Sequence, residues 1–206
     1  MILKICGITN QDDATAAIEA GATAVGFNFY ALSPRYIAPG QAAEIVTAKG
    51  VRRVGVFVNE KRERVEEIAR AARLDVAQLH GDETPADYPR QGKLKHAPPV
   101  WKALRIGDTF DIALFRDIPA EALLLDGPAA ELYGGAGKSF DWRLVRASDR
   151  QIVLAGGLDA SNVAAAIEMV RPWGVDACSR IESAPGRKDR KKMSEFLQAA
   201  MAAARV

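Results

Sequence analysis

The stretch Ala122-Leu123-Leu124-Leu125-Asp126-Gly127 shows the pattern that decides the fold, a continuous apolar run closed by an acid and a glycine. A run without alternation is typical of a parallel strand buried on both faces. Seven similar runs lie on either side of it, at intervals of roughly 20 to 30 residues, close to the length of one βα unit. The eight runs are Ile2–Cys6, Ala24–Phe29, Arg53–Val58, Val76–Leu79, Val100–Ala103, Ala122–Leu125, Ile152–Ala155 and Val175–Cys178.

Helical patterns occupy several of the gaps between these runs. The pattern predicts helices at Asp12–Ala20, stopped by Gly21, and at Lys61–Arg73, which carries one apolar stripe. Two more are predicted, one capped by Ser161 and reaching about Arg171, and a last one over Lys188–Ala204. Because the segment from 92 to 99 is polar and contains proline, we expect a short helix before the fifth strand and a weak one after it.

The order of these elements predicts an α/β fold, a single (β/α)8 TIM barrel that spans residues 1–206 as one domain. Eight βα repeats without a linker favour a closed parallel barrel over an open doubly wound sheet, which usually has fewer strands and a topological switch point.

Composition and charge narrow the functional classes. The chain has 206 residues, 49% of them hydrophobic and 26% charged, with a formal net charge of +2. This balance favours neither nucleic acid nor a membrane surface as a partner. With no signal-peptide pattern, no apolar stretch near about 20 residues and no zinc-type cysteine spacing, we expect a cytoplasmic protein with reduced thiols. The basic run from Arg187 to Lys192 is interpreted as the solvated start of the last helix.

Chemistry in this fold lies where strands end and βα loops begin. Cys6 closes the first run before Gly7, so its thiolate is a candidate base or nucleophile, although a lone cysteine is more often a small buried hydrophobe. Asp126 closes the sixth run. It is either a turn former or a partly desolvated acid at the barrel mouth, and the spacing alone leaves both open.

Two further loops suggest an anion site. Gly156 and Gly157 follow the seventh run, and Ser179 and Arg180 follow the eighth, where barrels of this type usually bind phosphate. The stretch from Gly134 to Ser139 does not fit a P-loop, since Leu132 stands where the pattern needs glycine. We interpret it as a loop that contacts substrate through residues such as Gly135.

Two polar side chains complete the candidate set. Arg35, in Ser33-Pro34-Arg35 after the second run, is either a surface residue or a partner for a carboxylate in fork geometry. His80 follows the fourth run and either orients substrate or is a satisfied polar residue at the rim.

These pieces, in this order, resemble the phosphoribosylanthranilate isomerase family over nearly the entire chain, and as an ordered set they are highly specific. The matching stretches are Lys4-Ile5-Cys6-Gly7-Ile8-Thr9, Gly26-Phe27 with Ser33-Pro34-Arg35, Gly55-Val56-Phe57-Val58-Asn59, Gln78-Leu79-His80-Gly81-Asp82-Glu83, Leu125-Asp126, Gly134 to Trp142, Leu154-Ala155-Gly156-Gly157-Leu158 and Glu182-Ser183-Ala184-Pro185-Gly186.

The resemblance implies an isomerase of tryptophan biosynthesis that performs an Amadori rearrangement on a small phosphorylated substrate, with no cofactor and no metal. Cys6 would be the general base and Asp126 the general acid. Arg35 would hold the anthranilate carboxylate, and Gly156, Gly157 and the loop after the eighth strand would hold the phosphate. We expect a monomer or a homodimer.

The chain departs from the family pattern after the eighth run, where Ser-Ser-Gly-Val-Glu is usual and Cys178-Ser179-Arg180-Ile181-Glu182 stands here. An arginine in place of glycine either alters the phosphate loop or adds a cation to it. Cys178 replaces a serine and is expected to pack. Because the first and eighth strands of a closed barrel are neighbours, we also expect Cys6 and Cys178 to lie near each other at one rim.

Two other functions remain as alternatives. A metal-dependent sugar-phosphate epimerase would need several His and Asp ligands at strand ends, and the chain has only His80 and His96. A catalytically dead phosphate-binding barrel, or an assembly subunit, should have lost Cys6 or Asp126, and both are present.

Overall fold

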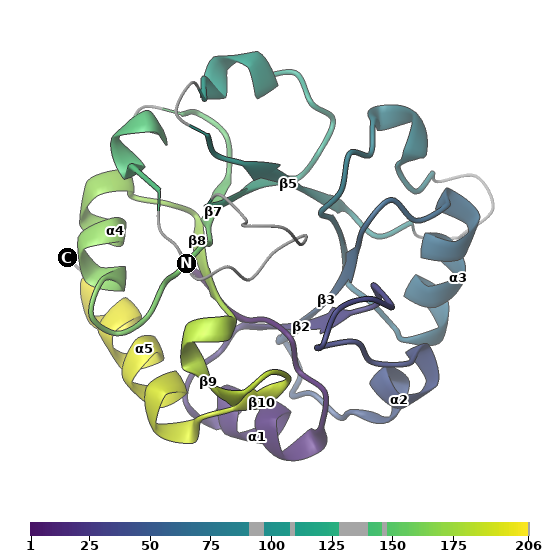
Figure 1. The fold of residues 1–206 in the computed structure, drawn as a ribbon, viewed down its shortest axis with the longest axis horizontal. Coiled ribbons are helices and arrows are strands. Elements are labelled where there is room, and N and C mark those ends of the chain that lie inside the picture. Colours follow the sequence, from purple (N-terminus) through teal and green to yellow (C-terminus); the bar gives the residue numbers. More distant parts are fainter. Residues whose placement is uncertain (91–96, 108–109, 128–139, 146–147, 206) are drawn as a thin grey trace.

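The computed structural model describes residues 1–90, 97–107, 110–127, 140–145 and 148–205. Eight parallel strands close into a barrel in the order β1-β2-β3-β4-β5-β6-β7-β8, and the helices surround this ring (Figure 1). The strands are β1 (Ile2–Ile5), β2 (Ala24–Asn28), β3 (Arg52–Phe57), β4 (Val76–Leu79), β5 (Val100–Arg105), β6 (Ala122–Asp126), β7 (Ile152–Leu154) and β8 (Gly174–Ala177). The predicted closed barrel is confirmed, with each strand within two residues of its apolar run.

The α-helices are α1 (Gln11–Glu19), α2 (Pro39–Glu44), α3 (Arg62–Ala71), α4 (Val163–Val170) and α5 (Arg190–Ala203). In the described parts of the connections around β5, the helical elements are the 3-10 turns η1 (Pro85–Asp87) and η2 (Ile112–Phe115), where a short helix before β5 and a weak one after it were expected. A third 3-10 turn, η3 (Trp142–Val145), precedes β7. The short helix α2 was not predicted.

Two helix starts differ from the prediction. Asn162, not Ser161, stands before α4, and the Ser161 hydroxyl instead donates to the Asp159 carboxylate at 2.5 Å. The last helix begins two residues later than expected, at Arg190. Asp189 caps it by accepting from the backbone of Lys191 and Lys192, because an aspartate before a helix can satisfy its free N–H groups.

The residues before α5 form a small hairpin that the sequence did not indicate. The turn η4 (Ser179–Ile181) leads into β9 (Glu182–Ala184), which pairs antiparallel with β10 (Arg187–Lys188). The Thr9 hydroxyl donates to the Gly186 carbonyl at 2.6 Å, and the Lys188 amide donates to Asp13 at 2.9 Å. The hairpin is therefore attached to the loop after β1 and to α1.

The core has two parts, as a closed barrel requires. One lies between the strands and the helices, and the other fills the inside of the barrel. The inner part consists of Ala24, Val54, Val76, Trp101, Ala103, Ala122, Leu124, Val153 and Ala155. Trp101 is fully buried and packs edge-on against Trp173, with ring centroids 5.6 Å apart. Apolar side chains thus fill most of the lower interior, and the polar side chains gather toward the carboxyl ends of the strands.

A buried arginine fastens two helix ends to the barrel wall. Arg53 donates from Nη2 to the Ala42 carbonyl at 2.6 Å, from Nη1 to Ile45 at 2.8 Å and from Nε to Ala72 at 3.1 Å. Its guanidinium also lies over the Phe27 ring, 4.8 Å from the centroid. One cation thus satisfies carbonyl groups where α2 and α3 end.

We predict that Arg53→Met lowers the free energy of unfolding by about 2–4 kcal/mol, because three buried carbonyls lose a charged donor. Arg64→Met is the matched control, since Arg64 is exposed and pairs with Glu67 one helical turn away. Urea unfolding of both variants measures the difference. Equal stability of the two variants would contradict the structural role of Arg53.

Candidate active site

Cys6 lies directly after β1, where its amide still donates to the Ala177 carbonyl of β8 at 2.9 Å. Its side chain faces the barrel interior beside Gly26, and only 9% of the residue is exposed. Gly7 follows with φ +74°, and a Cβ there would stand 2.8 Å from Arg35 Cδ and 3.1 Å from Cys178 Sγ. A glycine at this position therefore lets the chain turn while two side chains approach Cys6.

The environment of Cys6 lowers the pKa of its thiol well below the usual range. The main cause is a hydrogen bond from the Cys178 thiol, which outweighs the opposing effect of burial, and the nearby ammonium groups of Lys4 and Lys188 add to it. The same hydrogen bond, together with burial, raises the pKa of Cys178. The arrangement favours a thiolate on Cys6 and a proton on Cys178.

A buried ion pair lies one layer below the thiols. Lys4 is fully buried, and its Nζ is 2.7 Å from Asp176 Oδ2 across the β1–β8 pair. Burial raises the pKa of Asp176 to about 7, although the charge of Lys4 acts in the opposite direction. Asp176 Oδ1 finds no partner among the described residues. Lys4 thus places a positive charge below Cys6, held by a carboxylate from the opposite end of the sequence.

Asp126 ends β6 on the inner face of the barrel and is 8% exposed. Its Oδ2 is 3.2 Å from Nε2 of His80, which follows β4. The other ring nitrogen, Nδ1, is 3.0 Å from the Gln78 amide nitrogen. With Nδ1 accepting from this amide, the ring proton is on Nε2 and is donated to Asp126. His80 therefore orients the carboxyl group that the sequence singled out.

The loop after β7 approaches Asp126 closely because it contains glycine. Gly156 has φ +79°, and a Cβ on it would lie 2.3 Å from the Gly127 amide and 2.9 Å from Asp126 Oδ1. Any side chain at this position would displace the acid or the turn that follows it. Gly157 also has positive φ, and its carbonyl accepts from Asn162 at the start of α4.

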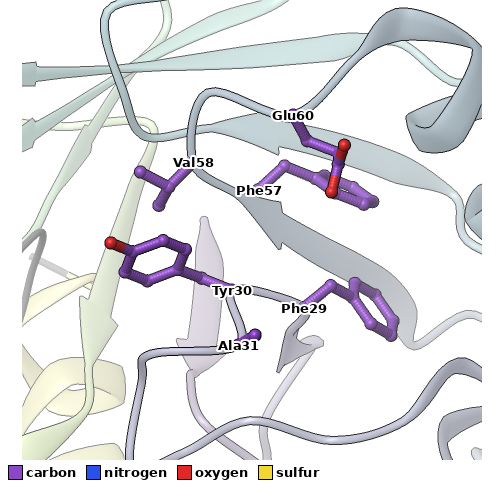
Figure 2. A pocket seen from close by; sticks show the side chains of 6 residues that line it. All are labelled: Phe29, Tyr30, Ala31, Phe57, Val58 and Glu60. Atoms are coloured by element: carbon purple, nitrogen blue, oxygen red, sulfur yellow. The ribbon is translucent and has the colours of Figure 1, made fainter.

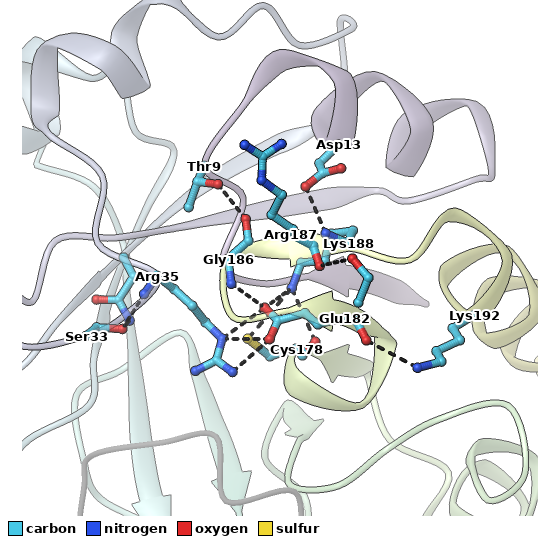
Figure 3. Close-up of polar contacts among 12 residues, drawn as sticks. Thr9, Asp13, Ser33, Arg35, Cys178, Glu182, Gly186, Arg187, Lys188 and Lys192 are labelled. Carbon is cyan, nitrogen blue, oxygen red and sulfur yellow. Dashed lines mark hydrogen bonds and ion pairs between the residues drawn. The ribbon is translucent and has the colours of Figure 1, made fainter.

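A network of charges joins the loop after β2 to the hairpin after β8 (Figure 3). Arg35 donates to Glu182 from Nε at 2.9 Å and from Nη2 at 2.8 Å, in a fork geometry. Glu182 also accepts from Lys188 Nζ at 2.8 Å. Lys188 Nζ in turn donates to the Cys178 carbonyl at 3.2 Å and lies 3.9 Å from Cys178 Sγ. Despite burial, Arg35 and Lys188 hold the pKa of Glu182 below its usual range.

The sequence interpretation of the basic run is wrong for Lys188. Its side chain is 0% exposed and belongs to the hairpin, not to a solvated helix start. A charged run is normally assigned to the surface because its partners are unknown. Here the partner, Glu182, lies six residues earlier and is brought back by the β9–β10 turn.

Arg180 lies in the turn η4 with negative φ, so replacing the family's usual glycine costs no backbone strain here. Its Nη1 is 2.6 Å from Asp159 Oδ2, and its side chain is 44% exposed. The pair connects the loop after β8 to the loop after β7, next to Ser179 on one side and Gly157 on the other.

The structure therefore places eight of the nine predicted site residues at the carboxyl ends of the strands. These are Cys6, Arg35, His80, Asp126, Gly156, Gly157, Ser179 and Arg180. Gly135 lies outside the described residues, as does His96. Cys178 follows β8 and Cys6 follows the paired strand β1, so the two lie near each other at one rim, as predicted.

Sequence reasoning missed Lys4, Asp176, Glu182 and Lys188. The sequence did contain a signal for Lys4 and Asp176, because each is a charged residue inside an apolar run that the fold buries on both faces. Buried charges of this kind need partners. Lys102 on β5 obeys the same rule, with Nζ 2.8 Å from buried Glu83.

A small hollow of about 240 Å³ opens at the ends of β2 and β3. Figure 2 shows its lining, which consists of Phe29, Tyr30, Ala31, Phe57, Val58 and Glu60. Its lining does not include Cys6 or Asp126.

The described residues contain no group of three or more His, Cys, Asp or Glu side chains placed to hold a metal ion. Within the same ranges, no helix has the length and apolar character needed to cross a bilayer.

The closed parallel barrel, with titratable side chains gathered at the carboxyl ends of its strands, places the chain among the (β/α)8-barrel enzymes. Comparison with known proteins defines it further. The profile of the N-(5'-phosphoribosyl)anthranilate (PRA) isomerase family matches residues 3–199, and the chain belongs to this family.

The relatives support this assignment over the full length. The N-(5'-phosphoribosyl)anthranilate isomerase of Solibacter usitatus is 68% identical over 203 residues, covering 98% of each chain. A crystal structure of monomers generated from the dimeric isomerase of Thermotoga maritima is 39% identical, with a TM-score of 0.83 over 98% of this chain and 100% of that one. A phosphoribosylanthranilate isomerase in complex with reduced 1-(o-carboxyphenylamino)-1-deoxyribulose 5-phosphate is 38% identical, with the same TM-score and coverage.

We predict that Lys188→Met lowers the free energy of unfolding by about 2–4 kcal/mol, slightly below the usual loss for a broken buried pair because Arg35 still neutralises Glu182. The variant should also raise the pKa of Cys6, since Lys188 is one of the cations that lower it. Denaturant unfolding and the ultraviolet absorbance of the thiolate against pH measure both effects. Lys191→Met, at an exposed position, is the control. A Cys6 pKa that is the same in both variants would remove Lys188 from the electrostatics of the site.

Proposed function

We propose that this chain converts N-(5-phosphoribosyl)anthranilate into 1-(2-carboxyphenylamino)-1-deoxyribulose 5-phosphate, an isomerisation in tryptophan biosynthesis. The observation that carries the proposal is the arrangement of Cys6 and Asp126. One is a thiol of lowered pKa after β1, the other a carboxyl group held by His80 at the end of β6, and both lie on the inner face of the barrel. The identity of the substrate is inferred from membership of the isomerase family.

The reaction needs one acid and one base. Asp126, protonated, gives its proton to the ribose ring oxygen, and the ring opens to a protonated Schiff base. The Cys6 thiolate then removes the proton from the neighbouring ribose carbon, which gives an enolamine that converts to the ketone. His80 donates to the Asp126 carboxylate once its proton is gone. Each positioned proton transfer contributes roughly 100- to 10,000-fold in rate.

Charged and glycine-containing loops would bind the two ends of the substrate. Among the described residues, Glu182 takes Nε and Nη2 of Arg35, which leaves the Nη1 edge of the guanidinium for the anthranilate carboxylate. Gly156, Gly157, Ser179 and Arg180 would bind the phosphate, with backbone N–H groups and one cation. Gly135 would contact substrate from the loop after β6.

The remaining predictions concern partners. Electrons are only redistributed within the substrate, so the proposed reaction uses no cofactor and no metal. We propose a cytoplasmic enzyme that acts as a monomer or a homodimer, without nucleic acid or membrane partners. The Thermotoga maritima relative is described as dimeric.

We predict that Cys6→Ser and Asp126→Asn each fold and bind product but turn over at least about 100-fold more slowly, the loss expected for a missing base or acid. The fluorescence change on phosphoribosylanthranilate turnover measures the rate, and titration with product measures binding. Asp117→Asn is the control, because Asp117 is an exposed carboxylate outside the barrel mouth. Near-normal turnover in Cys6→Ser or Asp126→Asn would remove the role assigned to that residue.

Chelation distinguishes this function from that of a metal-dependent epimerase. We predict that turnover of phosphoribosylanthranilate survives exhaustive EDTA treatment, because proton transfer between side chains and substrate needs no Lewis acid. Loss of activity that a divalent ion restores would favour the epimerase. Product binding without turnover in the unaltered chain would indicate a catalytically dead barrel.

We predict that Arg180→Gly raises KM and weakens inhibition by inorganic phosphate, with little change in kcat. Asp159 engages only Nη1 of Arg180 among the described residues, so the other donors can reach the phosphate. The free energy of substrate binding should weaken by about 1–3 kcal/mol, the scale of a hydrogen bond to a charged group. Asp159→Asn is the matched control, since it breaks the pair and keeps the guanidinium. An unchanged KM and unchanged phosphate inhibition in Arg180→Gly would show that the side chain serves only to pair with Asp159.

A further inference from the structure

Cys6 and Cys178 occupy neighbouring positions on the paired strands β1 and β8. The register ends with Ile5 opposite Ala177, and the Cys6 amide continues the ladder by donating to Ala177. The two cysteines come next, one after each strand, and a Cβ on Gly7, directly after Cys6, would lie 3.1 Å from Cys178 Sγ. Neighbouring strands lie about 4.8 Å apart, within the range of Cα separations, about 4.4–6.8 Å, that disulfides span. Both thiols are free in this structure.

The two thiols differ in charge and exposure. Cys6 is buried, with Lys4 below it, and favours the thiolate. Cys178 is partly exposed, its pKa is raised by the neighbouring Cys6 thiol, and the Lys188 ammonium lies 3.9 Å from its sulfur. A nucleophilic thiolate beside a second thiol, with a cation next to that second thiol, is the arrangement of a peroxide-sensitive cysteine and its resolving partner.

We propose that Cys6 and Cys178 form a reversible redox pair, in which hydrogen peroxide oxidises Cys6 and Cys178 then closes a disulfide that switches the active site off. The pair itself rests on geometry. Its effect on turnover rests on the proposed role of Cys6 as the base.

The chemistry balances in two steps. The Cys6 thiolate attacks one peroxide oxygen and breaks the O–O bond, which gives a sulfenic acid and hydroxide. Cys178 then attacks the Cys6 sulfur, the S–O bond breaks, and water leaves with the proton that Cys178 gives up. Two thiols are oxidised to one disulfide while one peroxide is reduced to two waters, counting the proton that neutralises hydroxide. Lys188 stabilises the Cys178 thiolate needed for the second step.

The position of Cys178 allows this movement. It lies between β8 and the turn η4, outside any α-helix, with φ −136° and ψ −87°. On the other strand, Gly7 directly after Cys6 leaves the backbone free to adjust.

The test treats the reduced full chain with hydrogen peroxide and follows mass and turnover together. We expect an intramolecular disulfide, a loss of two hydrogens that peptide mapping assigns to Cys6 and Cys178, and a fall in turnover of at least about 100-fold. Dithiothreitol should restore both mass and turnover. Cys178→Ser is the matched variant. It should instead accumulate a Cys6 sulfenic acid that dimedone traps, and then over-oxidise to species that dithiothreitol does not reduce.

Three results would overturn the redox pair. They are sulfenic acid without a disulfide in the unaltered chain, disulfides only between molecules, and equal recovery by dithiothreitol in Cys178→Ser. A disulfide that forms while turnover persists gives a different answer. It would support the redox pair and overturn the role of Cys6 as the base. The experiment therefore distinguishes failure of the redox proposal from failure of the proposed catalytic role.

Discussion

Strand β1 hydrogen-bonds along its length to β8, and this closure brings the first residues of the chain against the last part of the sheet. Lys4 thereby meets Asp176, 172 residues away, and Cys6 meets Cys178. The same closure allows the hairpin after β8 to lie against the loop after β1 through Thr9 and Gly186. The effects of Cys178 and Lys188 on the Cys6 thiol depend on these two strands being neighbours, so an open sheet of the same elements would have no equivalent site.

The charges around the thiol are stabilised in pairs. Lys4 lies against Asp176, and Lys188 and Arg35 lie against Glu182, all within the barrel mouth or its rim. Buried ion pairs contribute little net stability, because the loss of hydration offsets their attraction. The clustering of these ion pairs around one thiol is better explained by a functional pKa shift than by stability. Desolvated charge partners are a common means of shifting the pKa of a functional group. Asp176 and Glu182 balance the charge of these cations through ion pairs.

Local pattern predicted most of the fold. Because each strand is buried on both faces, the eight apolar runs were continuous enough to locate β1 to β8 within two residues. Helix α2, only six residues long, has too little periodicity to identify, and the hairpin of β9 and β10 is too short to alternate. The candidate site followed from the rule that chemistry lies at strand ends, and that rule identified Cys6 and Asp126. It could not identify Glu182 or Lys188, because their burial depends on Arg35, 147 residues before Glu182, and on a turn that no local signal marks.

The residues proposed as base and acid lie in surroundings that differ in charge. Cys6 has cations below it and beside it and a thiol donor from Cys178, all of which favour loss of its proton. Asp126 lies against the neutral donor of the His80 ring, with Oδ2 3.2 Å from Nε2. Gly156 packs backbone, which carries no charge, against the other carboxyl oxygen. The barrel thus concentrates positive charge around Cys6 on the β1–β8 side. In the proposed mechanism the thiolate there takes a proton from the substrate, and Asp126 at the end of β6 gives one.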